Sequence, residues 1–148
     1  MLNKNSSDFL ILIPAYNEEK TIKKIIKNVS KFGKVLVIND ASNDSTKNEA
    51  LQAGAEVVTH KRNLGYNLAI ETGFKFFLKS KYRKIILLDA DGQHPISYIK
   101  HYKKYLNQNY DVICGVRNNV SRIGEKMFIF LTKLIWKLND PLCGMKGY

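Results

Sequence analysis

The chain has 148 residues, 45% hydrophobic and 25% charged, which is typical of one globular domain large enough to bury a core. Its 24 Lys and Arg residues exceed its 13 Asp and Glu residues, and the net charge of +11 favours anionic partners such as nucleotides or an anionic membrane surface. The two cysteines, Cys114 and Cys143, lack C-x-x-C spacing, which argues against a disulfide framework and a structural zinc site, so a reduced, cytoplasmic setting is expected.

The amino-terminal segment predicts neither a signal peptide nor a membrane span. Its apolar run is short and is broken by Pro14, and nowhere do about 18 apolar residues follow one another. We therefore expect a domain that does not cross a membrane by itself.

Strands and helices are predicted to alternate along the chain. Apolar runs predict strands at residues 9–13, 34–39, 55–59, 85–88 and 111–115. Helical spacing predicts helices at residues 18–32, in a short segment that ends at Leu51, and at residues 67–78 and 96–106. The first strand is expected to stop at Pro14. This alternation implies an α/β fold with a mostly parallel sheet covered on both faces, whose functional loops gather where the strands end.

Polar segments follow the first two predicted strands. PAYNEE contains Glu18 and Glu19 where a helix is expected to begin, and NDASND contains Asp40, Ser42 and Asp44. Taken alone, the glutamates fit a helix dipole, and the second segment fits an ordinary turn with a helix cap. Because both segments reach one edge of the sheet, they also suit a nucleoside, which needs a carboxylate near its base or ribose.

The segment IILLDADGQHP, residues 85–95, carries the clearest chemical signal. Asp89 and Asp91 follow a buried strand, and extended residues two apart point the same way. Two adjacent carboxylates repel each other, which favours a divalent cation between them and a polyanion such as a diphosphate. Gln93 can complete an oxygen shell for Mg²⁺ or Mn²⁺. The alternative is that the aspartates only cap a helix and solvate a turn.

These segments resemble the family-two glycosyltransferases with the GT-A fold, and within them the polyprenyl-phosphate (dolichyl-phosphate) mannosyl- and glucosyltransferases. The resemblance runs in the family's order through LIPAYNEE, VINDASNDST, HKRNLGYNLAIETGF, LLDADGQHP and DPLCGMKGY. It implies a Rossmann-like, three-layer α/β/α architecture with a mostly parallel central sheet. One such domain is expected over residues 1–148, without the usual C-terminal extension.

The resemblance also assigns residues to the donor nucleotide and the cation. Nucleotide contacts are implied for Pro14, Tyr16, Glu18, Asp40, Asp89, Ala90, Asp91 and Arg117. Pro14, Tyr16 and Glu18 would surround the nucleobase and ribose, Asp40 would contact the base, and Arg117 would lie near the phosphates. In the D-x-D element, Asp89, Ala90 and Asp91, the two aspartates would hold Mg²⁺ or Mn²⁺ together with Gln93. Asp91 and Gln93 are the best candidates for direct ligands, and Asp89 is the best candidate for the nucleotide side. Arg117 alone also fits an ordinary surface arginine.

Asp140, in DPLCG, matches a family aspartate near the anomeric carbon or the acceptor. For a sugar hydroxyl acceptor this carboxylate would be the general base. A lipid phosphate with a second pKa near about 6 is already largely ionised, so Asp140 would then position it. The alternative is a turn residue before Pro141.

The implied reaction is metal-dependent, inverting transfer of a sugar from GDP-mannose or a UDP-hexose to a polyprenyl (dolichyl) phosphate, with Asp91 and Asp140 as the catalytic residues. Alternatives are transfer to a saccharide hydroxyl, a nucleotidyltransferase or a noncatalytic nucleotide-binding module; no nucleic-acid partner is expected. Residues 123–138 fit contact with the cytoplasmic face of a membrane, core packing or an oligomer interface.

Three positions depart from the family pattern. Asn39 stands where an aspartate is common, GYN at residues 65–67 replaces glycine, lysine, glycine, and Lys146 stands where arginine is frequent. The second departure removes a lysine near the donor, and Lys61 and Arg62 are close enough in sequence to substitute.

Overall fold

The computed structural model describes residues 8–92, 95–108, 110, 112–115 and 146–148. The strands are β1 Phe9–Ala15, β2 Lys34–Asn39, β3 Glu56–Thr59, β4 Lys84–Leu87, β5 Ile113–Cys114 and β6 Lys146–Gly147. The helices are α1 Ile22–Val29, α2 Thr46–Gln52, α3 Tyr66–Leu78 and α4 Tyr98–Leu106. The strand and helix alternation predicted from the sequence is confirmed through β5.

The strands form one sheet in the order β3-β2-β1-β4-β6-β5. Strands β3, β2, β1 and β4 are parallel, whereas β6 runs antiparallel to both β4 and β5. The prediction of a mostly parallel central sheet is confirmed. Chain order moves outward from β1 to β2 and β3 on one side and to β4 on the other, so the direction of winding reverses between β1 and β4.

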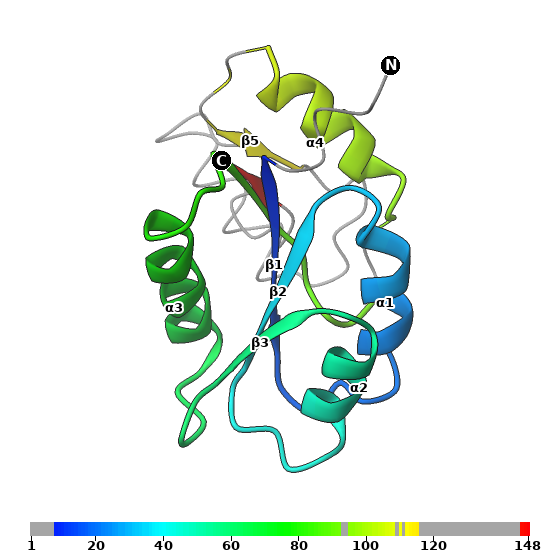
Figure 1. Cartoon of the computed structure of the whole chain (residues 1–148), viewed down its shortest axis with the longest axis vertical. Coiled ribbons are helices and arrows are strands. Elements are labelled where there is room, and N and C mark those ends of the chain that lie inside the picture. The colour runs from blue at the N-terminus through cyan, green and yellow to red at the C-terminus, as the bar shows by residue number, and fades with distance from the viewer. Residues whose placement is uncertain (1–7, 93–94, 109, 111, 116–145) are drawn as a thin grey trace, which may run out of the picture.

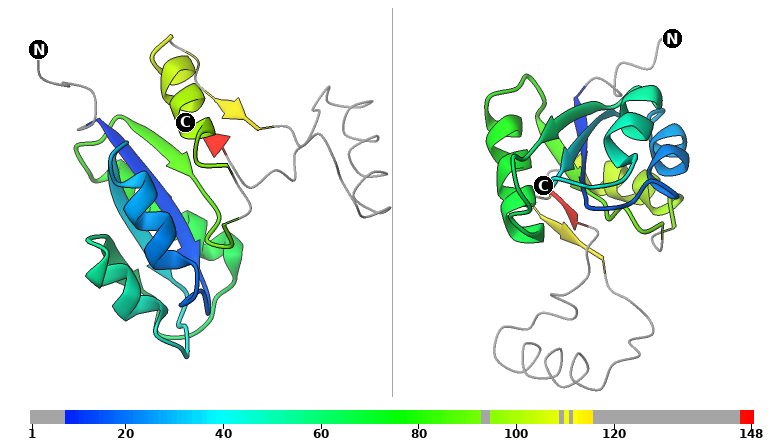
Figure 2. Two further views of the ribbon diagram at one scale, coloured as in Figure 1. Left: turned by 90° about the vertical axis from the view of Figure 1, so that its right-hand side faces the viewer. Right: turned by 90° about the horizontal axis from the view of Figure 1, so that it is seen from below.

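Helices cover both faces of this sheet. Successive residues of a strand point to opposite sides, so alternate residues of β1 contact different helices. On one face, odd-numbered β1 residues such as Ile11 and Ile13 pack with buried residues of α1, α2 and α4. On the other face, Leu10 and Leu12 pack with α3, whose Ala69 is fully buried. Figure 1 shows α3 to the left of the sheet and α1 and α2 to its right, and Figure 2 shows the same layers from two further sides. The three-layer α/β/α architecture is therefore confirmed.

The first strand does not stop at Pro14 but continues to Ala15, and this prediction was wrong. Backbone groups of β1 alternate between its neighbours: the Leu12 carbonyl accepts from the Leu88 N–H, and the Ala15 carbonyl accepts from the Asp40 N–H. The nitrogen of Pro14 therefore faces the β4 side, beyond the last β1–β4 pair at Leu12. A missing N–H removes no ladder hydrogen bond there, so proline is tolerated.

The helix predicted at residues 18–32 is shorter, and the other predicted bounds agree with the structure to within two residues. The backbone turns first, with the Thr21 and Ile22 N–H groups both donating to the Glu18 carbonyl, and α1 begins only at Ile22. Strand β6 was not predicted, because two residues carry no detectable periodicity. In the described part of the chain, we find no helix with the length and apolar character that crossing a bilayer requires.

Candidate active site

A cavity of about 380 Å³ opens where β1, β2 and β4 end. This is the edge at which open α/β sheets bind ligands, next to the point where the winding reverses. The right panel of Figure 2 views the molecule from the side of this edge. The cavity is lined by Pro14, Ala15, Tyr16, Glu18, Asp40, Asn63, Gly65, Tyr66, Ala69, Asp89, Ala90 and Asp91.

Seven of these lining residues are among those predicted for the donor nucleotide or cation, namely Pro14, Tyr16, Glu18, Asp40, Asp89, Ala90 and Asp91. The structure thus brings residues from three separate strand ends to one cavity. The contacts that each would make with a ligand stay predictions. Gln93, Arg117, Asp140 and residues 123–138 lie outside the described residues, and so does Cys143.

The loops after β1 and β2 are joined by reciprocal hydrogen bonds. The Asn17 N–H donates to Ser42 Oγ at 3.0 Å, while the Asn43 N–H donates to Asn17 Oδ1 at 2.9 Å. The Glu19 N–H donates to an Asp44 carboxylate oxygen at 3.1 Å. Each loop therefore supplies acceptors for backbone groups of the other, and the two form one rim of the cavity.

Thr46, the first residue of α2, ties this rim to the core. It is fully buried, and its Oγ1 accepts from the Glu18 N–H at 2.7 Å and donates to Asp44 Oδ1. Burial raises the pKa of the Asp44 carboxyl, but hydrogen bonds from the Thr46 side chain and from backbone N–H groups outweigh it and hold the pKa below its ordinary value. Asp44 is thus a structural carboxylate of the rim.

Asp40 is 3% exposed and holds the chain that leads from β3 into α3. Its Oδ1 accepts from the Leu64 N–H at 2.9 Å and its Oδ2 from the Gly65 N–H at 2.7 Å, and His60 Nδ1 lies 2.7 Å from Oδ1. Burial alone would raise the pKa of Asp40, but these hydrogen bonds lower it below 3.8 overall. Most of the acceptor capacity of this carboxylate is already used within the protein.

His60 extends this network into α3, because its Nε2 lies 2.9 Å from Thr72 Oγ1. An ionised Asp40 can only accept, so Nδ1 of His60 carries the hydrogen between them. The β2 end, the segment 60–65 and α3 are therefore fixed relative to one another around the cavity.

The two aspartates of the D-x-D element have different surroundings. Asp89 is half-buried, and its Oδ1 accepts from the Tyr66 hydroxyl at 2.7 Å, whereas Asp91 is exposed. Between them, the Ala90 carbonyl lies 2.7 Å from Thr21 Oγ1, which is also 2.8 Å from Glu18 Oε2. Thr21 thus connects the loop after β1 to the turn after β4.

This donor set suits a divalent cation. Asp89 and Asp91 contribute hard carboxylate oxygens to the same cavity, and Mg²⁺ or Mn²⁺ is commonly held by one or two carboxylates together with waters and ligand phosphates. In the part of the chain that the structure describes, no group of three or more His, Cys, Asp or Glu side chains could hold a metal by protein ligands alone.

Sequence reasoning missed several residues of the site. Asn63, Gly65, Tyr66 and Ala69 line the cavity, and Thr21 and His60 hold its walls. Gly65 and Tyr66 were singled out only as a departure from the family pattern. The hydrogen bonds of Tyr66 and Thr21 join residues 23 and 69 positions apart, a separation that no local pattern reveals.

The chain matches the family model "Glycosyl transferase family 2" over residues 10–138. Among curated proteins it is 32% identical to an undecaprenyl-phosphate 4-deoxy-4-formamido-L-arabinose transferase of Pectobacterium atrosepticum, over 74% of this chain and 36% of that protein. It is 25% identical to a dolichyl-phosphate hexose transferase of Haloferax volcanii, over 95% of this chain and 66% of that protein. The chain spans between about a third and two thirds of the length of the curated relatives it matches.

Among solved structures, the fold matches glucosyl-3-phosphoglycerate synthase from Mycobacterium tuberculosis in complex with Mn²⁺, UDP-glucose and phosphoglyceric acid. The TM-score is 0.76 at 19% identity, covering 95% of this chain and 56% of that one. This likeness concerns the fold, whereas the family model covers most of the sequence. The chain belongs to glycosyl transferase family 2 and has the GT-A fold that its sequence motifs predicted.

Proposed function

We propose that this domain transfers a hexose from a nucleoside diphosphate sugar to an acceptor, in a single inverting displacement that depends on Mn²⁺ or Mg²⁺. The observation that carries the proposal is the common cavity of Asp40, Asp89 and Asp91, which follow the ends of β2 and β4 on either side of β1. The fold match to a protein solved with Mn²⁺ and UDP-glucose supports a UDP-linked donor, and GDP-mannose is the alternative.

The residues of the cavity would divide the work between nucleotide and diphosphate. Pro14, Tyr16 and Glu18 would surround the base and ribose on a rim that is already held in place by its own hydrogen bonds. Asp89 and Asp91, with Gln93, would hold the cation beside the diphosphate. When bound, the cation would supply neutralisation of the charge that grows on the leaving diphosphate. Asp40 would then act mainly by fixing the segment that carries Leu64 and Gly65.

A polyprenyl phosphate is the acceptor we favour. Two relatives are named for transfer involving undecaprenyl phosphate and dolichyl phosphate. A phosphate acceptor is already largely ionised near neutral pH and needs no general base, so Asp140 would position it. A saccharide hydroxyl is the alternative acceptor, and Asp140 would then remove its proton. Residues 123–138 would lie against the cytoplasmic face of the membrane where such a lipid is found, and Arg117 would contact the donor phosphates.

A thermal-shift panel of nucleoside diphosphates with and without Mn²⁺ tests the donor site. A ligand at about 100 times its dissociation constant stabilises the folded state by about 2.7 kcal/mol, so UDP or GDP should raise the unfolding midpoint in the presence of Mn²⁺. Asp91→Asn should abolish this rise, whereas Asp8→Asn, an exposed aspartate before β1, should retain it. If no nucleotide stabilises the protein with or without Mn²⁺, the proposed function is wrong.

The acceptor is tested separately with a radiolabelled nucleotide sugar. Incubation with undecaprenyl phosphate should yield a labelled lipid. Asp91→Asn should lower the rate of transfer strongly while changing the free energy of unfolding little. Label that moves only to added oligosaccharide would replace the lipid phosphate with the saccharide acceptor.

A further inference from the structure

We propose that Tyr66 is a positioning residue that orients Asp89 for the divalent cation. This inference rests on the proposed function and extends it to a side chain outside the D-x-D element. The Tyr66 hydroxyl donates to Asp89 Oδ1 at 2.7 Å, and both residues line the same cavity.

Tyr66 is itself held by its neighbours in the chain. It is the first residue of α3 and directly follows Gly65, whose N–H donates to Asp40 Oδ2. Gly65 has φ +88° and ψ 163°, a backbone region that is essentially restricted to glycine. The Asp40 carboxylate and this glycine therefore set where α3 begins and how Tyr66 leaves the backbone. A continuous connection runs from the end of β2, through Gly65 and Tyr66, to Asp89 at the end of β4.

The hydrogen bond from Tyr66 contributes little to folding but suits a metal site. Tyr66 is 47% exposed, and a hydrogen bond accessible to water adds little net stability. A carboxylate offers about four acceptor directions, so a phenol on one oxygen does not prevent the same carboxylate from ligating a cation. Partners that orient a ligating carboxylate typically change metal affinity by about 10- to 100-fold when they are removed.

The test compares Tyr66→Phe with Tyr98→Phe, a matched loss of one hydroxyl from an exposed tyrosine on α4 outside the cavity lining. Mn²⁺ is titrated into each protein at saturating UDP, and the electron paramagnetic resonance signal of free Mn²⁺ gives the dissociation constant. Tyr66→Phe should weaken Mn²⁺ binding by about 10- to 100-fold. Tyr98→Phe should bind as the wild type does.

Two further readouts separate positioning from a structural role. The thermal midpoint and the affinity for UDP in EDTA should be unchanged in Tyr66→Phe. Equal or tighter Mn²⁺ binding by Tyr66→Phe, with normal binding by the wild type, would overturn the inference and leave the proposed function standing. A wild-type protein without saturable Mn²⁺ binding at saturating UDP would overturn both.

Discussion

Asp40 lines the cavity and is held by three hydrogen-bond partners within the protein, namely His60, Leu64 and Gly65. Its three hydrogen-bond partners stabilise the ionised form more than burial destabilises it, so its pKa in the folded protein lies below the ordinary value of 3.8. The unfolded chain therefore takes up the proton first as the pH falls. The stabilisation is fully present above about pH 4 and is lost as the pH drops through the folded pKa.

Asp40→Asn should remove this pH dependence along with the stabilisation. An amide nitrogen in place of a carboxylate oxygen cannot accept, so at least one N–H of Leu64, Gly65 or His60 loses its acceptor, at a cost of roughly 2–4 kcal/mol. Urea unfolding between pH 7 and pH 3 measures the effect: the loss of stability on acidification should be smaller in Asp40→Asn. Asp8→Asn should follow the wild-type curve, and an Asp40→Asn protein with wild-type acid sensitivity would contradict this account.

Replacing Thr46 should destabilise the protein almost as much as replacing Asp40, because Thr46 is fully buried between two loops. Thr46→Val keeps the shape but leaves the Glu18 N–H without its acceptor, which should cost about 1–3 kcal/mol in the free energy of unfolding. The same exchange at Thr59, exposed on the edge strand β3, should be nearly neutral. Chemical denaturation of both variants checks this. Equal losses in the free energy of unfolding would show that the buried hydroxyl of Thr46 stabilises the protein no more than the exposed hydroxyl of Thr59.

The sequence predicted the position of some cavity residues but not of others. Asp40, Asp89 and Asp91 each follow an apolar run, and a parallel sheet necessarily brings the ends of such runs to one edge. Tyr66 and Thr21 depend on distances between loops, which only the folded backbone determines. Whether the predicted residues contact nucleotide or metal stays a prediction.

Among the structural elements, prediction succeeded where packing controls the backbone. The buried apolar runs of β1, β2 and β4 and the apolar spacing in α4 placed these elements to within about two residues, which is the usual uncertainty of element boundaries. Prediction failed at Glu18 and Glu19, which lie in the loop before α1 and whose N–H groups donate to the side chains of Thr46 and Asp44. It also failed at Pro14, because the sequence does not say on which side of a strand the pairing has ended.

The start of α3 should be sensitive to substitution of Gly65. Gly65 and Gly54 both have φ +88°, and an added Cβ at either meets no atom within 4 Å, so only backbone strain is introduced. Gly65→Ala and Gly54→Ala should each lose about 1–2 kcal/mol of stability.

Only Gly65→Ala should also weaken binding to the cavity, because Gly65 lines it and directs Tyr66, whereas Gly54 follows α2 and is absent from the lining. Calorimetric titration with UDP and Mn²⁺, alongside urea unfolding, separates the two effects. Equal affinities in the two variants would argue that the geometry at Gly65 does not matter to the ligand.

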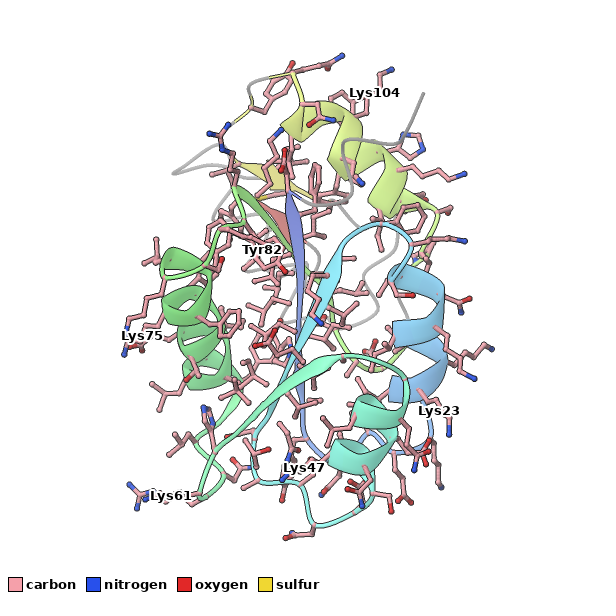
Figure 3. The ribbon with its side chains drawn as sticks, viewed as in Figure 1. Lys23, Lys47, Lys61, Lys75, Tyr82 and Lys104 are labelled. Atoms are coloured by element: carbon pink, nitrogen blue, oxygen red, sulfur yellow. The ribbon has the colours of Figure 1, made fainter. Side chains whose placement is uncertain are left out.

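Among the described residues, four acidic side chains line the cavity, namely those of Glu18, Asp40, Asp89 and Asp91, whereas lysines lie on several helices and loops outside it. Figure 3 shows Lys23, Lys61, Lys75 and Lys104 pointing outward from α1, the loop after β3, α3 and α4. The net charge of +11 gives long-range attraction to anionic surfaces.

The domain should therefore bind vesicles that contain anionic lipid, and the binding should weaken between about 0.1 M and 1 M salt, as the Debye length falls from about 10 Å to about 3 Å. Co-sedimentation with anionic and neutral vesicles measures this. Binding to neutral vesicles that persists at high salt would instead indicate an apolar contact, as proposed for residues 123–138. No binding to either would contradict both.

Strand β6 has a consequence for the order of folding. It pairs Gly147 with Ile86 and joins β5 to the sheet, so contacts distant in sequence complete that half of the molecule. Loop-closure entropy opposes such contacts early, whereas β1, β2 and β3 are linked by short crossovers. We expect a transition state in which these three strands are already paired and β5 and β6 are still separate, so substitutions near Gly147 would mainly speed unfolding.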